Sequence, residues 1–409
     1  MFKKAFSLSW LGTRTVLTNV MLVVSAFVWY ATILFTLMDT IGTVGEPSSF
    51  APVTQFLLWG IHFSGLIFSA LLGVSLSKKI GRTKFLMFWM FLSVISSLML
   101  FTLNTSSVLI LSLLVLLLGV SLGLGMPACM SFYSDCVPIE NRGRVSGVAL
   151  LISGIGIFAF AILPLTDMML LGISLAIWRL LSLVAFFAVK SSIKTEPIKD
   201  IDSYKSIIGR QSFLTYFIPW IMFSLINYLA APLEPNFGGA SNMLFLVKTA
   251  FLGMFAILGG FFVDSVGRKR IAIAGFAMLG LSSAALGVSS EGLISLYFSS
   301  VLEGAAWGLL LALFLLILWG DLSHSISTDK YYAIGVAPFF ISKLLELTVG
   351  NFIGNNLPPT ALFPFTSFFL FLAVLPLVYA PETLPEKSMK DRELKSYLEK
   401  AQKVKEKYS

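Results

Sequence analysis

The sequence has very little charge for its length. Only 12% of its 409 residues are Asp, Glu, Lys or Arg, whereas 57% are hydrophobic and the mean hydropathy is +0.88. Soluble domains carry about 25% charged residues. The shortage of charge therefore excludes an ordinary soluble protein and predicts a membrane-embedded chain without a sizeable soluble domain. The net charge of +8 is interpreted as an unequal distribution of cations across a membrane, not as a sign of nucleic-acid binding.

Cysteine and histidine are nearly absent. The two cysteines, Cys129 and Cys136, fall near one predicted helix end and are expected to be reduced thiols. Two histidines cannot build a metal cluster, and the chain has neither a nucleotide-binding loop nor a set of residues around a Ser or Cys nucleophile. We therefore expect no metal, no cofactor and no enzymatic activity. Without a nucleotide site, any pumping must draw on an ion gradient.

Long apolar runs, in contrast, are abundant. A membrane-spanning helix needs about 20 mostly apolar residues. Twelve segments qualify: 16–39, 52–76, 84–103, 107–132, 145–165, 168–189, 212–233, 241–263, 271–289, 292–320, 331–353 and 358–380. The first is interpreted as a retained span, because its apolar core is too long for a signal peptide.

One long polar linker divides these segments into two sets of six. The predicted organisation is an N-terminal six-helix bundle (1–189), a linker (190–211), a C-terminal six-helix bundle (212–380) and a basic tail (381–409). The spacing of polar and apolar residues in the tail predicts a short basic amphipathic helix or a solvated segment.

The cations are strongly segregated along the chain. All Lys and Arg residues except Arg179, Lys248 and Lys343 lie in the N-terminus, in loops that follow even-numbered segments, or in the tail. Cytoplasmic loops carry the excess of Lys and Arg in membrane proteins. Both termini are therefore predicted to be cytoplasmic, and we expect a monomer that spans the lipid bilayer of the plasma membrane many times.

Two of the basic turns are repeats of each other. The stretch GVSLSKKIGRTKF at 73–85 aligns with GGFFVDSVGRKRI at 259–271 when it is shifted by 186 residues. Internal symmetry of this kind is typical of many transporter folds. Within these stretches the shift pairs Gly81 with Gly267 and Arg82 with Arg268. Outside them it pairs Asp135 with Asp321 and His62 with Lys248.

The second of these turns carries a motif. Gly260, Asp264, Gly267 and the cations that follow form the pattern G-x-x-x-D-x-x-G-R-K-R. With twelve segments in two parallel halves, this pattern resembles the loop signature of the major facilitator superfamily. YSDCVPIENRGRVSG at 133–147 and APETLPE at 380–386 resemble two more of its motifs, the latter common in sugar and organic-solute porters. The resemblance covers essentially the whole chain.

The resemblance implies a fold and a general function. It implies an all-α membrane protein of two pseudo-symmetric six-helix bundles with a central cavity between them, which moves a small molecule by alternating access. The branch stays open. Segment 212–233 lacks the glutamine-rich pattern of sugar porters, and segment 145–165 lacks the Gly-Pro pair of drug antiporters. Neither a sugar nor a drug is therefore supported as the substrate.

The helix ends explain the cations and glycines of the basic turns, but they do not explain the acid Asp264. Helix C-termini carry partial negative charge and favour cations just beyond them, and Gly81 and Gly267 suit a turn with positive φ. Asp264 is unfavourable at such an end. It is either exposed, or it has a partner such as Arg268 or the N-terminus of a facing helix, for which the resemblance indicates segment 331–353.

The first turn departs from the motif, with Lys78 at the position of Asp264. Lys78 is expected to reach Asp135, with Arg82 as the competing partner. The predicted cytoplasmic gate comprises Lys78, Gly81, Arg82, Asp135, Arg142, Asp264, Gly267, Arg268 and Asp321.

Few ionisable side chains lie within the predicted spans. Such groups are costly in a bilayer and mark functional positions by default, and these lie near the depth at which transporter sites form. The candidate substrate- or ion-binding residues are His62, Asn227, Tyr228, Lys248, Glu303, Trp307, Lys343 and Glu346. The alternative for the four charged residues of the second half is a structural set of ion pairs, and Arg179 has no assigned role.

Three functions are compatible with these features. They are a proton-coupled secondary transporter of a small organic solute, a passive facilitator, and a non-transporting sensor or lipid-handling protein. Titratable groups in the spans favour the first. We hypothesise that His62 and Glu346 face each other and couple proton movement to the conformational change. The alternative is a permanent ion pair of Lys343 with Glu346 or Glu303, with His62 bonded to a backbone carbonyl.

Pairs of glycines four residues apart predict where helices approach closely. They are Gly119 with Gly123 in segment 107–132, and Gly304 with Gly308 in segment 292–320. Small residues at this spacing let helix backbones come together in a membrane.

Overall fold

The fold was analysed in a computed structural model of the chain. The structure describes residues 14–43, 51–104, 107–163, 167–189, 202–230, 239–290, 292–350 and 358–384. The predicted tail helix and most of the predicted linker lie outside these ranges. Below, the first half means the described residues up to 189, and the second half means those from 202 onward.

In the first half, the long helices follow one another along the chain. They are α2 (Arg14–Thr43), α3 (Ala51–Ile80), α4 (Arg82–Leu98) with the 3₁₀ helix η2 (Met99–Asn104), α5 (Val108–Gly123), α6 (Met126–Cys136), α7 (Arg142–Ile162) and α8 (Met168–Val189).

The second half repeats this order after a short helix. Its helices are α9 (Tyr204–Ile208), α10 (Gln211–Ala230), α11 (Gly239–Ser265), α12 (Arg268–Val288), α13 (Leu293–Leu311), the π-helix η5 (Ala312–Ile317), α14 (Leu318–Ser323), α15 (Thr328–Gly335), α16 (Ala337–Leu345), the π-helix η6 (Glu346–Gly350), α18 (Pro359–Leu372) and α19 (Val374–Tyr379).

The prediction of an all-α membrane protein is confirmed. Each predicted segment coincides with one helix or with a run of consecutive helices. Among the described residues, 11 helices are long and apolar enough to cross a membrane, and a shorter apolar helix spans Gln211–Ile226. Several helices extend beyond the apolar segments. For example, α3 continues through Lys78 and Lys79, because cations are favourable in the last turn of a helix.

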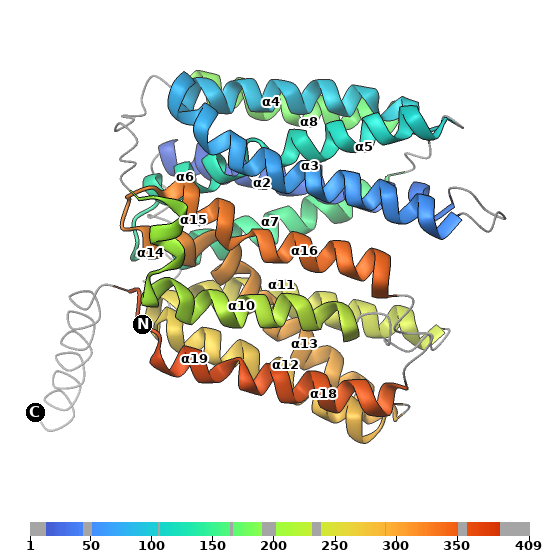
Figure 1. The fold of residues 1–409 in the computed structure, drawn as a ribbon, viewed down its shortest axis with the longest axis vertical. Coiled ribbons are helices and arrows are strands. Elements are labelled where there is room, and N and C mark those ends of the chain that lie inside the picture. The colour runs from blue at the N-terminus through green and yellow to red at the C-terminus, as the bar shows by residue number, and fades with distance from the viewer. Residues whose placement is uncertain are drawn as a thin grey trace, which may run out of the picture.

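The helices lie side by side, with the first half in the upper part of Figure 1 and most of the second half in the lower part. Helix pairing repeats between the halves. In the first half α3 packs on α5, α4 on α8, and α2 on α7 and α8. In the second half α11 packs on α13, α12 on α18, and α10 on α16 and α18. Position by position these are equivalent pairs, so the repeat seen in the sequence is also a repeat of packing.

The contacts between the halves also involve equivalent helices. Helix α7 of the first half packs along α11, and α3 packs against α15 and α16. Helix α6 also contacts α15. The end of α11 therefore faces the beginning of α7, while the end of α3 faces the beginning of α15. These two junctions carry most of the charged residues discussed below.

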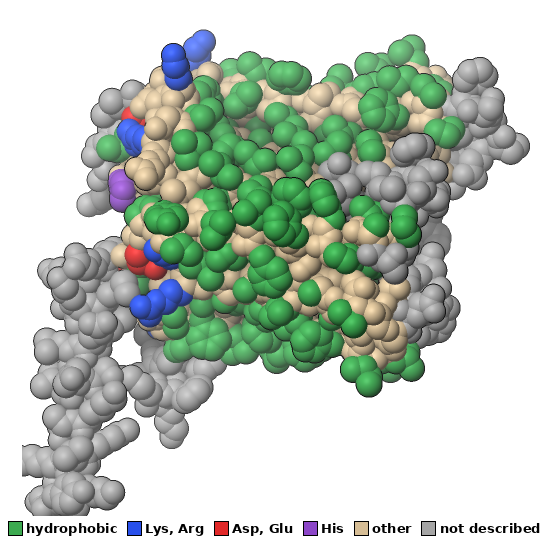
Figure 2. All heavy atoms as spheres, turned by 60° about the horizontal axis from the view of Figure 1, so that its bottom comes forward, with side chains coloured by type: hydrophobic (Ala, Val, Ile, Leu, Met, Phe, Trp, Pro, Cys, Tyr) green, Lys and Arg blue, Asp and Glu red, His purple; other side chains and the backbone are tan. Residues whose placement is uncertain are grey.

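The surface has an apolar belt. Figure 2 shows hydrophobic side chains across the middle of the visible face, with charged side chains gathered at the left end. Large apolar residues are exposed on the outer helices, among them Phe68, Leu109, Phe245 and Phe368. An apolar patch of this size is unfavourable in water but suits the hydrocarbon core of a bilayer.

Candidate functional site

The charged turns gather at one end of the helical assembly, which we call the basic end. It comprises the connections at 80–82, 136–142, 265–268 and 323–328. Gly81 and Gly267 directly precede α4 and α12 and have φ values of 88° and 114°. The predicted positive φ is thus confirmed at both turns. Because only glycine adopts this conformation without strain, the two residues allow sharp reversals between packed helices.

Asp321, on α14, is the centre of the larger ion-pair cluster at the basic end. Its side chain is 0% exposed. The carboxylate accepts hydrogen bonds from Arg142 Nη1 on α7 and from Arg268 Nε, the latter at 2.8 Å. Thr383 Oγ1 donates to it at 3.3 Å. Arg142 belongs to the first half and the others to the second, so this cluster joins the two halves.

Asp264 binds the beginning of a facing helix. Its side chain is also 0% exposed, and its two carboxylate oxygens accept hydrogen bonds from the backbone N–H groups of Gly143 and Arg144, each at 2.9 Å. These groups belong to the first turn of α7, where free N–H groups favour an anion. Arg268 lies 3.7 Å from the same carboxylate.

The prediction that Asp264 has a partner is confirmed for both the N-terminus of a facing helix and Arg268, which excludes the alternative of an exposed acid. One expectation is corrected: the facing helix is α7 (142–162), not the segment 331–353 that the resemblance indicated. The reason is the packing between the halves. Helix α11 runs along α7, whereas α15, which begins that segment, lies against α3.

The first-half turn uses its arginine, not Lys78, to bind Asp135. Arg82 donates to Asp135 at 2.5 Å and to Asp329 at 2.9 Å. The expected pairing of Lys78 with Asp135 is thus replaced by the competing partner. Lys78 is exposed and interacts electrostatically with Asp329, and unfavourably with Lys330, on α15. The acid at this junction stands on the second-half helix instead of at the end of α3.

Two acids of the basic end were missed in the sequence. Asp329 stands in the first turn of α15 and is 1% exposed. Glu382 accepts hydrogen bonds from the backbone N–H groups of Arg268 at 2.8 Å and Lys269 at 3.2 Å, so it caps α12. Glu382 belongs to the APETLPE stretch, which was noticed only as a family resemblance. An acid near a predicted helix start was the available signal for Asp329.

The described end of the predicted linker is attached to α15. Arg210 donates to Asp202 at 2.5 Å and to the hydroxyl of Tyr331 at 2.6 Å. The backbone N–H of Asp202 donates to Ser327 Oγ at 3.1 Å. Movement of α15 would therefore also move this part of the chain.

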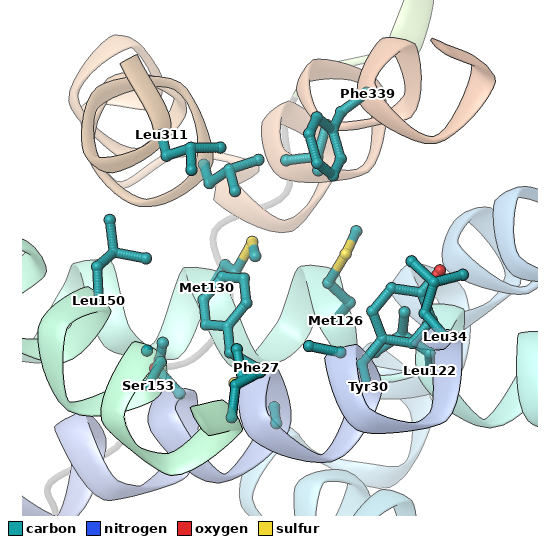
Figure 3. A pocket seen from close by; sticks show the side chains of 18 of the residues that line it. Phe27, Tyr30, Leu34, Leu122, Met126, Met130, Leu150, Ser153, Leu311 and Phe339 are labelled. Atoms are coloured by element: carbon teal, nitrogen blue, oxygen red, sulfur yellow. The ribbon is translucent and has the colours of Figure 1, made fainter. Parts of the chain in front are cut away.

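A central cavity of about 280 Å³ lies between the halves. Figure 3 shows Phe27, Tyr30 and Met130 of the first half on one side of it, and Leu311 and Phe339 of the second half on the other. The lining is almost entirely apolar. Among its few polar groups, the Ser153 hydroxyl donates to the Ala149 carbonyl of its own helix.

A second cavity of about 600 Å³ is lined by residues of the second half and by Phe35 of α2. It brings together five of the predicted binding residues: Lys248, Glu303, Trp307, Lys343 and Glu346. The four charged side chains form two ion pairs, each with an N–O distance of 2.6 Å. All four remain between 21% and 26% exposed. They therefore border the cavity and are accessible to a bound molecule.

His62 lies away from these groups. Its ring is fully buried, and Nδ1 is 3.0 Å from the carbonyl oxygen of Val115. The Tyr30 ring stacks parallel to it. Glu346 pairs instead with Lys343 of its own helix. The structure thus contains the alternative arrangement, in which the lysine holds Glu346 and a backbone carbonyl holds the histidine. Asn227 and Tyr228 belong to α10, but their side chains lie outside the described residues.

Arg179 is fully buried in the first half. It donates to Ser25 Oγ at 3.1 Å and to Ser93 Oγ at 3.2 Å, and its guanidinium lies over the rings of Trp29 and Trp89. Hydroxyl acceptors and aromatic faces stabilise a buried guanidinium, and only Nε of Arg179 has no hydrogen-bond partner among the described residues. This supports a packing role behind the central cavity.

The glycine pairs mark equivalent helix crossings. A Cβ on Gly119 would lie 2.2 Å from the carbonyl oxygen of His62, and one on Gly304 would lie 2.2 Å from that of Lys248. The predicted close approach is confirmed at both sites. His62 and Lys248 are 186 residues apart, but the two glycines are 185 apart. The π-helix η5 (312–317) lies between Gly304 and Asp321, and a π-helical turn accommodates one extra residue.

The geometry and the fold can be compared with known proteins. No family model matches the sequence, and no curated protein matches it either. Solved structures do match over nearly their whole length. The chain has the fold of the major facilitator superfamily, as two of these structures illustrate.

One is the proton:xylose symporter XylE bound to 6-bromo-6-deoxy-D-glucose. Its TM-score is 0.69 at 16% sequence identity, covering 90% of this chain and 96% of that chain. Another is the human organic anion transporter MFSD10 (TETRAN). Its TM-score is 0.66 at 15% identity, covering 89% of this chain and 98% of that chain. At these identities the likeness concerns the fold.

Proposed function

We propose that this protein is a secondary active transporter that carries a small organic solute across the membrane by alternating access, coupled to protons. The observation that supports it best is the central cavity between the halves together with the ion-pair clusters that join the halves at the basic end. These clusters would hold one side closed. The distribution of Lys and Arg supports a cytoplasmic position for that side and for both termini. The proposed location is the plasma membrane. The transporter would work as a monomer and convert nothing chemically.

A direct test uses proteoliposomes that contain the purified protein. They are exposed to a mixture of small organic solutes extracted from cells, and uptake is followed by mass spectrometry with and without an imposed pH gradient. We expect at least one solute to accumulate above its external concentration only when the gradient is present. Entry to equal concentrations in both conditions would favour a passive facilitator. No uptake beyond that of empty liposomes would contradict transport.

Asp264→Asn is expected to slow transport about tenfold or more, while the protein still inserts in the membrane. Asparagine has one carbonyl oxygen, so it cannot accept from both Gly143 and Arg144 as the carboxylate does, and hydrogen bonds to charged groups contribute about 1.5–3 kcal/mol each. Initial uptake rates and the amount of folded protein by gel filtration are the measurements. The matched control is Asp39→Asn, because Asp39 is an exposed acid near the C-terminal end of α2. Wild-type turnover in Asp264→Asn would exclude a gating role.

Proton coupling is proposed to act through the carboxylates of the second cavity. Protonation of Glu303 or Glu346 would release Lys248 or Lys343 from its ion pair and change the charge that faces the cavity. We expect Glu346→Gln to keep exchange of the solute across the membrane but to lose accumulation driven by a pH gradient. His62→Gln tests the earlier hypothesis in the same assay. If both variants accumulate the solute with the wild-type pH profile, neither residue carries the coupling.

A further inference from the structure

The two cavities adjoin each other. Leu252 on α11, Leu311 on α13 and Phe339 on α16 line both of them. A molecule bound across this boundary would contact both halves in the central cavity. In the second cavity it would contact residues of the second half and Phe35 on α2. The volumes, about 280 and 600 Å³, together fall within the range of about 300–1,000 Å³ that is usual for ligand pockets.

The central cavity suits an apolar group. Its wall is made of Phe, Leu, Ile, Val, Met and Ala side chains, with Tyr30, Ser153, Cys129 and Trp89 as the residues that carry polar atoms. The Ser153 hydroxyl and the Trp89 ring N–H donate to backbone carbonyls, so they are already satisfied. The Tyr30 hydroxyl is buried and has no hydrogen-bond partner among the described residues. A charged ligand, or one with several hydroxyl groups, would therefore lose more hydrogen bonds to water here than this single hydroxyl can replace, which is unfavourable.

The second cavity suits a charged group of both signs. Two lysines and two glutamates border it in two ion pairs, and Ser282, Ser283, Ser342, Thr249 and Thr366 add hydroxyl groups to the lining. The four charges sum to zero. A group with a single charge would be repelled by one member of each ion pair as strongly as it is attracted by the other. A zwitterion can place its anionic part beside the lysines and its cationic part beside the glutamates.

We infer that the substrate is a zwitterionic amphiphile, a molecule with an apolar tail and a head group that carries one positive and one negative charge. The tail occupies the central cavity, and the head occupies the cavity of the second half between the Lys248–Glu303 and Lys343–Glu346 pairs. This inference rests on the proposed transport function and specifies its substrate class.

The test compares head groups on one tail. The protein in lipid nanodiscs binds radiolabelled dodecylphosphocholine below its micelle concentration, and empty nanodiscs are subtracted. Dodecyltrimethylammonium, dodecyl phosphate and dodecyl maltoside carry the same tail with cationic, anionic and neutral heads, and glycerophosphocholine carries the head alone. We expect dodecylphosphocholine to bind at least about tenfold more tightly than each of the others, as one charge-assisted contact contributes about that factor. Equal displacement by all four twelve-carbon amphiphiles would overturn the inference.

Variants separate the two cavities. Gly154 lines the central cavity, and a Cβ added to it meets nothing within 4 Å. Gly154→Leu begins with a Cβ that meets no other atom, and it should place apolar atoms in the space proposed for the tail. We expect it to weaken the binding of dodecylphosphocholine about tenfold and to leave the binding of glycerophosphocholine unchanged. If both ligands weaken equally, the tail does not occupy this cavity.

Two charge variants should shift the preference for charged ligands in opposite directions. Glu303→Gln leaves an extra positive charge in the second cavity and should shift preference toward dodecyl phosphate, whereas Lys343→Met should shift it toward dodecyltrimethylammonium, each by about tenfold. The ratio of the affinities of two ligands, measured on one sample, does not depend on the fraction of folded protein. Lys79→Met, an exposed residue of α3, makes the same charge change outside the cavity and should leave the ratio unchanged. Ratios that do not change in the two cavity variants would overturn the head-group assignment, even if the transport assay succeeds.

Discussion

Asp321→Asn is expected to open the basic end. Removing one partner of a buried ion pair costs about 3–5 kcal/mol, and here two arginines, Arg142 and Arg268, lose the same carboxylate. The closed arrangement is destabilised relative to any arrangement in which these arginines reach water. A shift of this size changes the ratio of two conformations by more than about a hundredfold.

The measurement uses a cysteine that is already present. Cys129 is buried and lines the central cavity, and in a Cys136→Ser background it is the single thiol of the chain. A membrane-impermeant maleimide applied at the basic end should label Cys129 at least about tenfold faster in Asp321→Asn than in the parent protein, in proportion to the open population.

The repeat offers a matched control in Asp135→Asn. Asp135 is the equivalent residue of the first half, but its side chain is 33% exposed, and its partner Arg82 keeps Asp329 at 2.9 Å. Ion pairs exposed to this degree contribute little, so labelling should change less than about threefold. Equal labelling of the Asp321→Asn and Asp135→Asn variants would mean that the buried cluster does not close the basic end.

The second large effect is expected at the helix crossings. Gly119→Ala and Gly304→Ala each place a Cβ about 2.2 Å from a backbone carbonyl oxygen, of His62 and Lys248 respectively. Backbone cannot move aside as a side chain does, so α3 must separate from α5, and α11 from α13. Overpacking of this kind costs about 1–3 kcal/mol or more. Thermal unfolding in nanodiscs measures the loss.

Gly60→Ala controls for the change of residue type. Gly60 lies on α3, and its Cβ would meet nothing within 4 Å. Because alanine is favoured over glycine within helices by about 0.5–1 kcal/mol, this variant should be as stable as the parent protein or more so. An equal loss of stability at Gly60 and at Gly119 would show that close approach is not the cause.

The sequence was sufficient for the features that depend on local composition. Apolar length located the membrane segments, and the two glycines of the basic turns indicated their positive φ. The glycine pairs marked two helix crossings correctly. These predictions succeed because each depends on a residue and its neighbours along the chain.

Predictions about partners were less successful, because they depend on which helices of opposite halves face each other. Asp264 was recognised as needing a partner, but α7 could not be identified as the facing helix without the packing of α11 along it. Lys78 is the partner that the sequence predicts for Asp135, but the structure pairs Asp135 with the competing Arg82. The one-residue offset between Gly119 and Gly304 concealed their equivalence, since a π-helix leaves no clear signal in composition.

Lys78 and Asp264 occupy equivalent positions in the two halves but carry opposite charges, which affects how the halves recognise each other. At one junction an acid, Asp264, meets the positive N-terminus of α7 and Arg144. At the other, the cation Lys78 lies near the acid Asp329 and the cation Lys330. Two copies of the first half would set Lys78 against Arg144, because Lys78 stands at the position equivalent to Asp264. These like charges would repel. In the chain itself Asp264 takes that place, so at this junction the two halves fit each other as the different subunits of a heterodimer do.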